Sequence, residues 1–138
     1  MQIQPYLFFD GRCEQALDFY KQTLGAKVEA LMRYKDNPDP KYNPPNSGEK
    51  VMHSCFRVGD TQVMASDGNC TGKPSFQGFS LTFNAADEAD AKRRFNALAE
   101  GGQVNLPLSE TFFAKSFGMV ADRFGVSWMV LAEPKKPA

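Results

Sequence analysis

The stretch that most constrains the fold of this chain is residues 110–131, E-T-F-F-A-K-S-F-G-M-V-A-D-R-F-G-V-S-W-M-V-L. It is rich in aromatic and β-branched residues, and the segment 122–125 (D-R-F-G) interrupts it. Two such runs around a short, glycine-containing break are typical of antiparallel strands joined by a tight reversal. Residues 126–131 are almost wholly apolar, which predicts a closing strand that is buried on both faces.

Length and charge narrow the class of protein. A chain of 138 residues forms one domain, or two half-domains that share a core. Sixteen basic residues balance sixteen acidic ones, so no net charge attracts nucleic acid or an anionic membrane. No apolar run approaches the roughly 18 residues of a membrane span, and residues 1–4 do not begin a secretory signal. We therefore expect a cytoplasmic protein with neither nucleic acid nor membrane as a partner.

The three cysteines, Cys13, Cys55 and Cys70, are an odd number and lack the spacing of metal ligands. Reduced thiols are therefore expected rather than a disulfide framework.

The first half of the chain predicts a strand, a helix and three more strands. The helix has apolar residues at helical spacing from Cys13 to Leu24, and Gly25 ends it. Gly59-Asp60 is typical of a two-residue hairpin turn and fixes the register of the strands beside it. The predicted strands are 5–9, 27–34, 51–58 and 61–66, with a loop over 35–50 that contains four prolines.

The second half repeats the same order of elements. Asp87 is placed to cap a helix that runs to about Glu100. The shift that carries Phe19 onto Phe95 also carries Gly25 onto Gly101, which predicts an internal duplication. The predicted strands are 79–83, 103–112, 116–121 and 126–131. The expected domains are a first module over 1–67, a linker over 68–77, a second module over 78–132 and a flexible tail over 133–138.

Several motifs resemble the vicinal-oxygen-chelate superfamily, which includes glyoxalases, bleomycin-resistance proteins and extradiol dioxygenases. Phe19-Tyr20-x-x-x-Leu24-Gly25 resembles the first-helix signature of that superfamily. The closer resemblance is to its PhnB-like branch, and it rests on Pro5-Tyr6, Met64-x-Ser66-Asp67, Glu110-Thr111-Phe112-Phe113 and Asp122-x-Phe124-Gly125-x-x-Trp128-Met129. The resemblance implies an α+β fold of tandem βαβββ modules that form a curved mixed sheet around a cleft, the glyoxalase/bleomycin-resistance fold. It also implies a homodimer.

Superfamily enzymes typically hold a divalent metal with four side chains, from the first, fourth, fifth and eighth strands. In this chain the equivalent positions fall on Pro5, Met64, Gly78 and Met129. None of these binds a hard cation, and thioethers suit soft metals only. We therefore expect no metal and no cofactor.

Some PhnB-like proteins are described as ubiquinone methyltransferases. The chain has no glycine-rich loop after a strand and no acidic residue placed for the ribose of S-adenosylmethionine. Methyl transfer is therefore not expected.

The hairpin register predicts which residues line the cleft. Arg57 lies opposite Gln62 and Cys55 opposite Met64, and opposed residues share one face of the sheet. The same register places His53 opposite Ser66. The other face, with Phe56 and Val63, is the one that a helix would cover. The predicted cleft residues are His53, Cys55, Arg57, Gln62, Met64, Ser66, Ser80, Thr82, Phe113, Ser127 and Met129.

His53 and Glu110 are the two candidates for a catalytic base, and each has a simpler reading. No carboxylate in the hairpin is placed to orient the His53 imidazole, so a pocket-lining or partly exposed His53 is the favoured reading. For Glu110, a solvated carboxylate at the edge of a loop is favoured over a general base at the mouth of the cleft. Cys55 fits a small buried apolar residue, and Arg57 fits either a solvated side chain or a clamp for an anionic ligand.

Three functions are compatible with these residues. The leading prediction is a metal-free PhnB-like protein that binds or sequesters an unidentified small molecule. The first alternative is a lyase or isomerase that acts on a small oxygenated substrate with an atypical metal site. The second alternative is a structural or regulatory dimer without a ligand, since one fold can host all three.

The phenylalanines predict a homodimer. The chain has twelve of them, and Phe8, Phe56, Phe79, Phe83 and Phe95 are expected to lie beneath the helices. That leaves Phe112, Phe113, Phe117 and Phe124 as an apolar patch in or beside residues 110–131. Patches of more than a few hundred Å² usually mark an interface.

Overall fold

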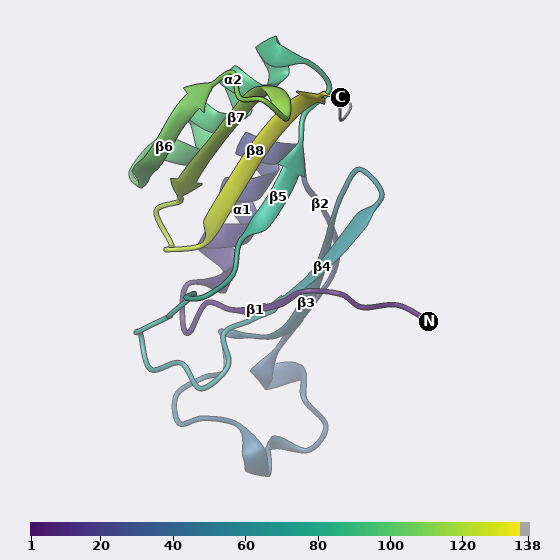
Figure 1. The fold of residues 1–138 in the computed structure, drawn as a ribbon. Helices are drawn as coiled ribbons and strands as arrows, with labels where there is room; N and C mark the ends of the chain where they lie inside the picture. Colours follow the sequence, from purple (N-terminus) through teal and green to yellow (C-terminus); the bar gives the residue numbers. More distant parts are fainter. Residues whose placement is uncertain (136–138) are drawn as a thin grey trace. The chain divides into compact units, whose positions relative to one another are not determined.

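The computed structural model describes residues 1–135 and divides the chain into two compact units, Met1–Pro74 and Ser75–Ala138. Within the described residues each unit holds one mixed sheet of four strands and one α-helix, in the order β-α-β-β-β (Figure 1). The predicted α+β class and the duplication of a βαβββ module are thereby confirmed. No helix in residues 1–135 combines the length and the hydrophobicity that crossing a membrane requires.

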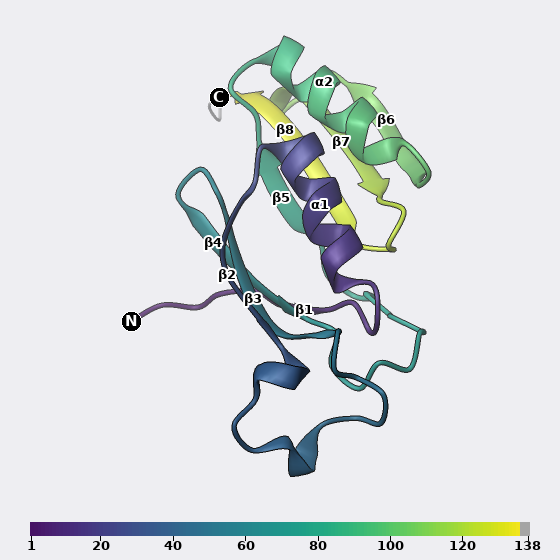
Figure 2. The same cartoon turned by 180° about the vertical axis from the view of Figure 1, so that it is seen from behind.

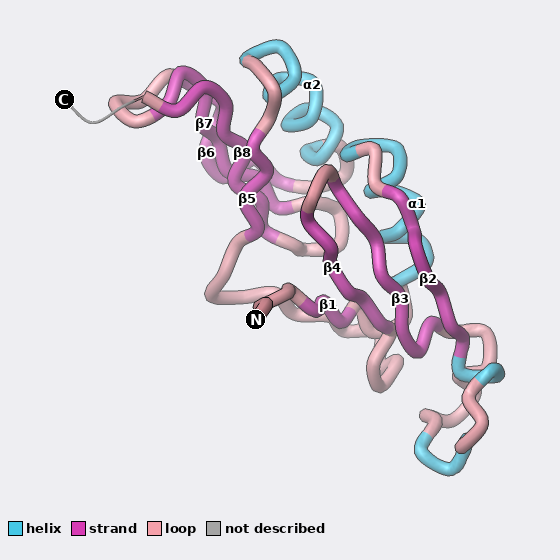
Figure 3. Tube along the Cα trace, turned by 90° about the vertical axis from the view of Figure 1, so that its right-hand side faces the viewer, coloured by secondary structure: helices cyan, strands magenta, loops and turns pink. Residues whose placement is uncertain are grey.

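The first unit contains a sheet with the strand order β1-β4-β3-β2 (Figure 3). Strand β1 is parallel to β4, and the other neighbouring pairs are antiparallel. Two short 3₁₀ helices, Tyr34–Asp36 and Pro40–Tyr42, lie in the proline-rich loop before β3. The elements are β1 (Tyr6–Phe8), α1 (Cys13–Leu24), β2 (Lys27–Arg33), β3 (Val51–Val58) and β4 (Thr61–Ser66).

Helix α1 packs on this sheet through its predicted apolar stripe, from Cys13 to Leu24, which is buried. The ring of Tyr20 stacks on that of Phe56 in β3, with centroids 5.7 Å apart. The helix ends at Gly25, whose φ of 67° is a left-handed conformation that other residues rarely adopt.

Asp67 ties three segments of the first unit together. Its carboxylate accepts hydrogen bonds from the backbone N–H groups of Gly11, Cys13 and Val51, at 2.9, 2.7 and 2.8 Å. Asp67 is 1% exposed. The residue directly after a strand usually bonds locally, but here the carboxylate joins the turn before α1 to the start of β3.

The second unit contains a sheet with the strand order β5-β8-β7-β6, in which β5 is parallel to β8. Helix α2 covers one face of this sheet (Figure 2). Asp87 caps the helix as predicted, because its side chain accepts a hydrogen bond from Asp90 N. The elements are β5 (Leu81–Asn84), α2 (Glu88–Ala99), β6 (Gln103–Ser109), β7 (Ala114–Ala121) and β8 (Ser127–Pro134).

The core of the second unit forms around β8. Trp128 is 4% exposed, and its indole N–H donates to Asp122 Oδ2 at 2.9 Å. The other carboxylate oxygen of Asp122 accepts from the N–H groups of Phe124 and Val126, so one side chain closes the turn between β7 and β8. Gly118 allows α2 to approach, since a Cβ there would lie 2.7 Å from the ring of Phe95.

Four phenylalanines lie on different sides from those predicted. Phe8 is 55% exposed, because the period of a strand turns its neighbours Leu7 and Phe9 into the core instead. Phe79 precedes β5 and is 46% exposed. Phe117 and Phe124 are buried at 7% and 5% exposure, so they do not belong to a surface patch.

The strand ends also differ from the prediction. Strand β8 continues to Pro134, into the segment predicted as a flexible tail, and residues 136–138 of that tail lie outside the described residues. Strand β6 ends at Ser109 rather than at residue 112.

Candidate functional site

The face of the first sheet that points away from α1 is called here the first open face. In β3, Ser54 and Phe56 are fully buried toward the helix, so His53, Cys55 and Arg57 lie on the opposite face. The ladder pairs Cys55 with Met64 and Arg57 with Gln62, as the hairpin predicted. Strand β1 adds Tyr6 and Phe8 to this face, because Tyr6 pairs with Met64 and Phe8 with Ser66.

Tyr6, Phe8 and His53 form an aromatic cluster on the first open face. The rings of Tyr6 and Phe8 stack with centroids 4.9 Å apart, and the phenol oxygen of Tyr6 lies 2.8 Å from His53 Nδ1. Tyr6 is 37% exposed, and its partial burial raises the pKa of its phenol. The ring of Phe8 lies against Gly68. A side chain at that position would crowd the ring, because its Cβ would lie 3.1 Å from it.

Gln4, Glu29, Arg57 and Gln62 form a polar cluster on the same face. Arg57 Nε donates to both carboxylate oxygens of Glu29 at 3.2 Å, and Gln62 Nε2 donates to Glu29 at 3.3 Å. Gln4 in turn donates to Gln62 Oε1 at 2.7 Å. The cluster carries one positive and one negative charge, so its net charge is zero.

Glu29 is the residue of this face that the sequence prediction missed. A bulge in β2 between Val28 and Ala30 leaves Glu29 out of the regular pairing with β3. Strict alternation along the strand therefore could not place its side chain. The one signal available was a lone carboxylate within the apolar part of this strand, between Val28 and Ala30.

Met64 and Cys55 lie between the aromatic and the polar cluster. Met64 is half-buried beside Tyr6, and Cys55 is 7% exposed with its sulfur 4.0 Å from Glu29 Oε1. Ser66 is 2% exposed and its hydroxyl bonds to the backbone of Val51. Ser66 is therefore a buried support beneath this face and is not accessible to a ligand.

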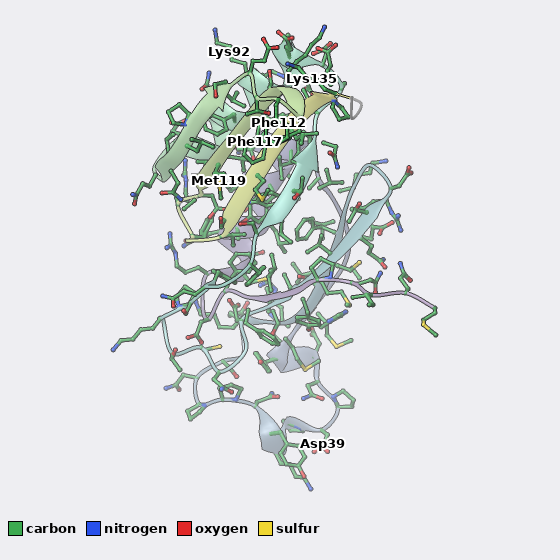
Figure 4. The ribbon with its side chains drawn as sticks, viewed as in Figure 1. Asp39, Lys92, Phe112, Phe117, Met119 and Lys135 are labelled. Atoms are coloured by element: carbon green, nitrogen blue, oxygen red, sulfur yellow. The ribbon has the colours of Figure 1, made fainter. Side chains whose placement is uncertain are left out.

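The second sheet has an open face of its own, on the side away from α2. Thr82 pairs with Met129, which pairs with Met119, and the hydroxyls of Ser80 and Ser127 lie 2.7 Å apart. Phe113 covers Phe117 edge to face at 5.0 Å, and Phe112 packs on Phe113 at 5.2 Å. Phe112 lies in the turn before β7, whereas Phe117 and Met119 lie on β7 (Figure 4).

The two candidate bases have different surroundings. The imidazole of His53 contacts the phenol of Tyr6, so its orienting partner comes from β1 and not from a carboxylate of the hairpin. Glu110 is exposed and forms an ion pair with Lys135, which lowers the pKa of the carboxyl group. A lowered pKa makes Glu110 a weaker base.

The metal positions of the superfamily do not fit a hard cation in this chain. In both units the fourth strand of the module carries a methionine, and the parallel strand beside it presents a hydroxyl: Tyr6 beside Met64, and Thr82 beside Met129. Tyr6, the residue after Pro5, therefore lies beside Met64, and Thr82 lies beside Met129. Thioethers are soft ligands, and neutral hydroxyls are poor substitutes for the carboxylates and imidazoles that bind hard divalent ions. Among residues 1–135 no three His, Cys, Asp or Glu side chains gather closely enough to hold a metal ion.

Comparison with known proteins places this fold in a family. Residues 1–131 match the model of the 3-demethylubiquinone-9 3-methyltransferase family. The chain is 33% identical to protein YjdN of Escherichia coli, over 99% of both chains. Its structure resembles that of protein PA1353 from Pseudomonas aeruginosa with a TM-score of 0.85 and 45% identity, over 96% of this chain and 98% of that one.

Two further structures locate the branch and the fold. A Bacillus cereus protein described as a 3-demethylubiquinone-9 3-methyltransferase and PhnB protein is 26% identical, with a TM-score of 0.80 over 96% of this chain and 99% of that one. A glyoxalase/bleomycin-resistance/dioxygenase domain from Frankia has a TM-score of 0.67 at 14% identity, over 99% and 95%, and shows the fold alone. The chain therefore has the glyoxalase/bleomycin-resistance fold and belongs to the 3-demethylubiquinone-9 3-methyltransferase family, in agreement with the PhnB-like resemblance of its sequence.

Proposed function

We propose that this protein binds a small organic molecule without a metal ion, and that the first open face contacts that molecule. The proposal rests mainly on one observation: the aromatic cluster of Tyr6, Phe8 and His53 and the polar cluster around Glu29 and Arg57 lie on the same face of one sheet. Ligand sites typically combine apolar and aromatic surface with a few polar groups that fix orientation. Phe8 and Tyr6 are exposed, yet stacking, the contact with His53 and the backing by Gly68 hold both rings in place.

Binding accounts for the polar groups of this face better than catalysis does. Glu29 and Arg57 are paired with each other, so the cluster offers a ligand hydrogen-bonding groups without a net charge. Methyl transfer, which the family description and the Bacillus cereus relative mention, is not part of the proposal. The sequence offers no glycine-rich loop after a strand for the methyl donor.

A second candidate function rests on the contact between Tyr6 and His53. A phenol within 2.8 Å of an imidazole nitrogen can relay a proton, as a lyase or isomerase needs. If this candidate is correct, Tyr6→Phe lowers turnover of a bound substrate by about 10²-fold or more and leaves its affinity nearly unchanged. If Tyr6 only contacts the ligand, Tyr6→Phe changes affinity instead.

The proposal includes a cytoplasmic homodimer. Phe112 is 90% exposed and Phe113 36% exposed, and a monomer would leave both rings in water. Because Phe117 and Phe124 are buried, the apolar patch is smaller than the sequence predicted. Phe112 and Phe113 are the residues that a partner subunit would cover.

The experiment that tests the proposal compares small molecules released from natively purified protein by untargeted mass spectrometry. Wild-type protein should release a compound in near-stoichiometric amount. Met64→Trp fills the centre of the first open face and should release much less. The control is Val104→Trp, which places the same bulky side chain at an exposed position of β6 and should behave as the wild type. Equal release from all three proteins would contradict the proposed site.

A further inference from the structure

We infer that the ligand of the first open face is a planar aromatic molecule that carries an uncharged hydrogen-bonding group. The inference rests on the proposed function, because it names the class of molecule that the same face binds. It is carried by two features of that face, a stacking surface and a polar cluster without net charge. The stacking surface lies on β1, and the polar cluster comes from β2, β3, β4 and Gln4.

The stacking surface consists of Tyr6 and Phe8. Their rings are nearly parallel, at 23° and with centroids 4.9 Å apart, and they are 37% and 55% exposed. His53 holds the phenol of Tyr6, and its ring lies 5.6 Å from that of Tyr6. Aromatic pairs gain from offset stacking beyond the area that they bury, so a flat ligand ring gains more here than a saturated ring of equal size.

Met64 extends this surface toward the polar cluster. It pairs with Tyr6 in β1 and with Cys55 in β3, and it is half-buried. A thioether packs favourably against the edge or face of an aromatic ring. The apolar surface of the first open face therefore consists of groups that favour π-systems.

The polar cluster begins at the next residue of β4 that points to the same face as Met64. Gln62 lies two residues from Met64 on β4, which corresponds to about 6.5 Å along the strand. That distance is about the length of a two-ring aromatic system. A ring system that stacks beside Met64 would therefore bring a substituent to Gln62 and its partners.

The composition of the polar cluster favours a neutral substituent. Glu29 already accepts hydrogen bonds from Arg57 and Gln62, and Arg57 also donates to the carbonyl of Asp60. Any charged group would meet one like and one opposite charge at close range. An amide can instead both donate and accept, as the side chain of Gln62 does when it accepts from Gln4 and donates to Glu29.

The test measures dissociation constants by ligand-observed NMR for three compounds: 2-naphthamide, its saturated decahydro analogue and 2-naphthoate. The aromatic amide should bind about twofold to tenfold more tightly than the saturated amide, which is the range expected for a stacked pair. It should also bind more tightly than the carboxylate. Equal affinity for the two amides, or no binding of the aromatic amide at millimolar concentration, would overturn the inference.

Two variants assign the effect to the stacking surface. Phe8→Leu keeps the apolar volume and removes the ring, so the affinity for 2-naphthamide should fall by about twofold to tenfold. Phe79→Leu makes the same change at a phenylalanine that is 46% exposed in the segment before β5, outside the first open face, and should leave the affinity unchanged. Circular dichroism confirms that both variants are folded. An unchanged affinity in Phe8→Leu would reject the stacking surface.

The inference and the proposed function can fail separately. If the mass spectrometry identifies a saturated or charged compound that Met64→Trp no longer retains, the proposed function stands and the planar ligand class is wrong. If neither a released compound nor any of the three test compounds binds, both are wrong.

Discussion

Among the described residues, Cys13 has a side-chain pKa that folding shifts strongly. It is fully buried at the start of α1, and its sulfur lies 3.7 Å from the hydroxyl of Ser54. Burial raises the pKa of this thiol from 9.0 to about 12. The folded protein therefore keeps Cys13 protonated at pH values where the unfolded chain has ionised.

This difference predicts an alkaline loss of stability. The contribution of Cys13 is fully present below about pH 9 and is lost as the pH rises through about 12, since only the unfolded chain releases the proton in that window. The slope is about 1.4 kcal/mol per pH unit. Urea unfolding of wild type and Cys13→Ala between pH 8 and 11 measures it. The free energy of the wild type should fall more steeply, and parallel curves would contradict the prediction.

Adjacent residues of β8 should respond very differently to substitution. Trp128→Ala leaves a cavity and removes the hydrogen bond to Asp122, so it should cost about 3–5 kcal/mol in unfolding free energy. Met129 is half-buried on the open face, and Met129→Leu should cost less than about 1.5 kcal/mol. Chemical denaturation that ranked the two the other way would mean that the faces of β8 are inverted.

The sequence predicted some residues of the first open face and not others, for physical reasons. The two-residue turn at Gly59-Asp60 fixes the register of β3 and β4, so Arg57 opposite Gln62 could be read directly. The contact between Tyr6 and His53 could not be predicted in this way. It depends on parallel pairing between strands far apart in the chain, which leaves no local sequence pattern. Glu29 was hidden by a bulge, which breaks the alternation on which the prediction depends.

At the scale of the elements, Asp67 joins three parts of the first unit. Asp67→Ala removes the acceptor of three backbone N–H groups and should cost more than about 3 kcal/mol, since hydrogen bonds to charged groups contribute about 1.5–3 kcal/mol each. The matched control is Asp39→Ala, in the exposed loop between β2 and β3 (Figure 4), which should change stability by less than about 0.5 kcal/mol. Thermal or chemical unfolding of both variants checks the contrast. Equal effects would show that Asp67 has no special structural role.

The helices were predicted more accurately than the ends of the strands. Each helix carries its own signals, an apolar stripe and a terminal residue such as Gly25 or Asp87, and both ends were found within one or two residues. Strand ends depend on pairing with distant segments. Strand β5 begins only where Leu81 meets Trp128, and β8 extends to Pro134 because Ala114 in β7 lies opposite it.

At the scale of the whole molecule, the homodimer predicts a clear difference between two phenylalanines. Phe112→Asp places a charge on an exposed ring position and should give a folded monomer of 15.3 kDa. Phe117→Asp buries a charge within the unit and should unfold the protein instead. Sedimentation at low micromolar concentration, with circular dichroism for folding, measures both. A wild-type protein that sediments as a monomer would contradict the dimer.

The central claim is that this protein binds a small organic molecule and needs no metal ion to do so. Native mass spectrometry of protein purified without added ligand tests this most directly, because ligand, metal and subunit number all appear in one mass. We predict a species of twice the 15.3 kDa chain mass, with an additional organic mass that dissociates on mild activation and no mass of a bound metal. A stoichiometric metal ion, or a species without any bound molecule, would contradict the claim.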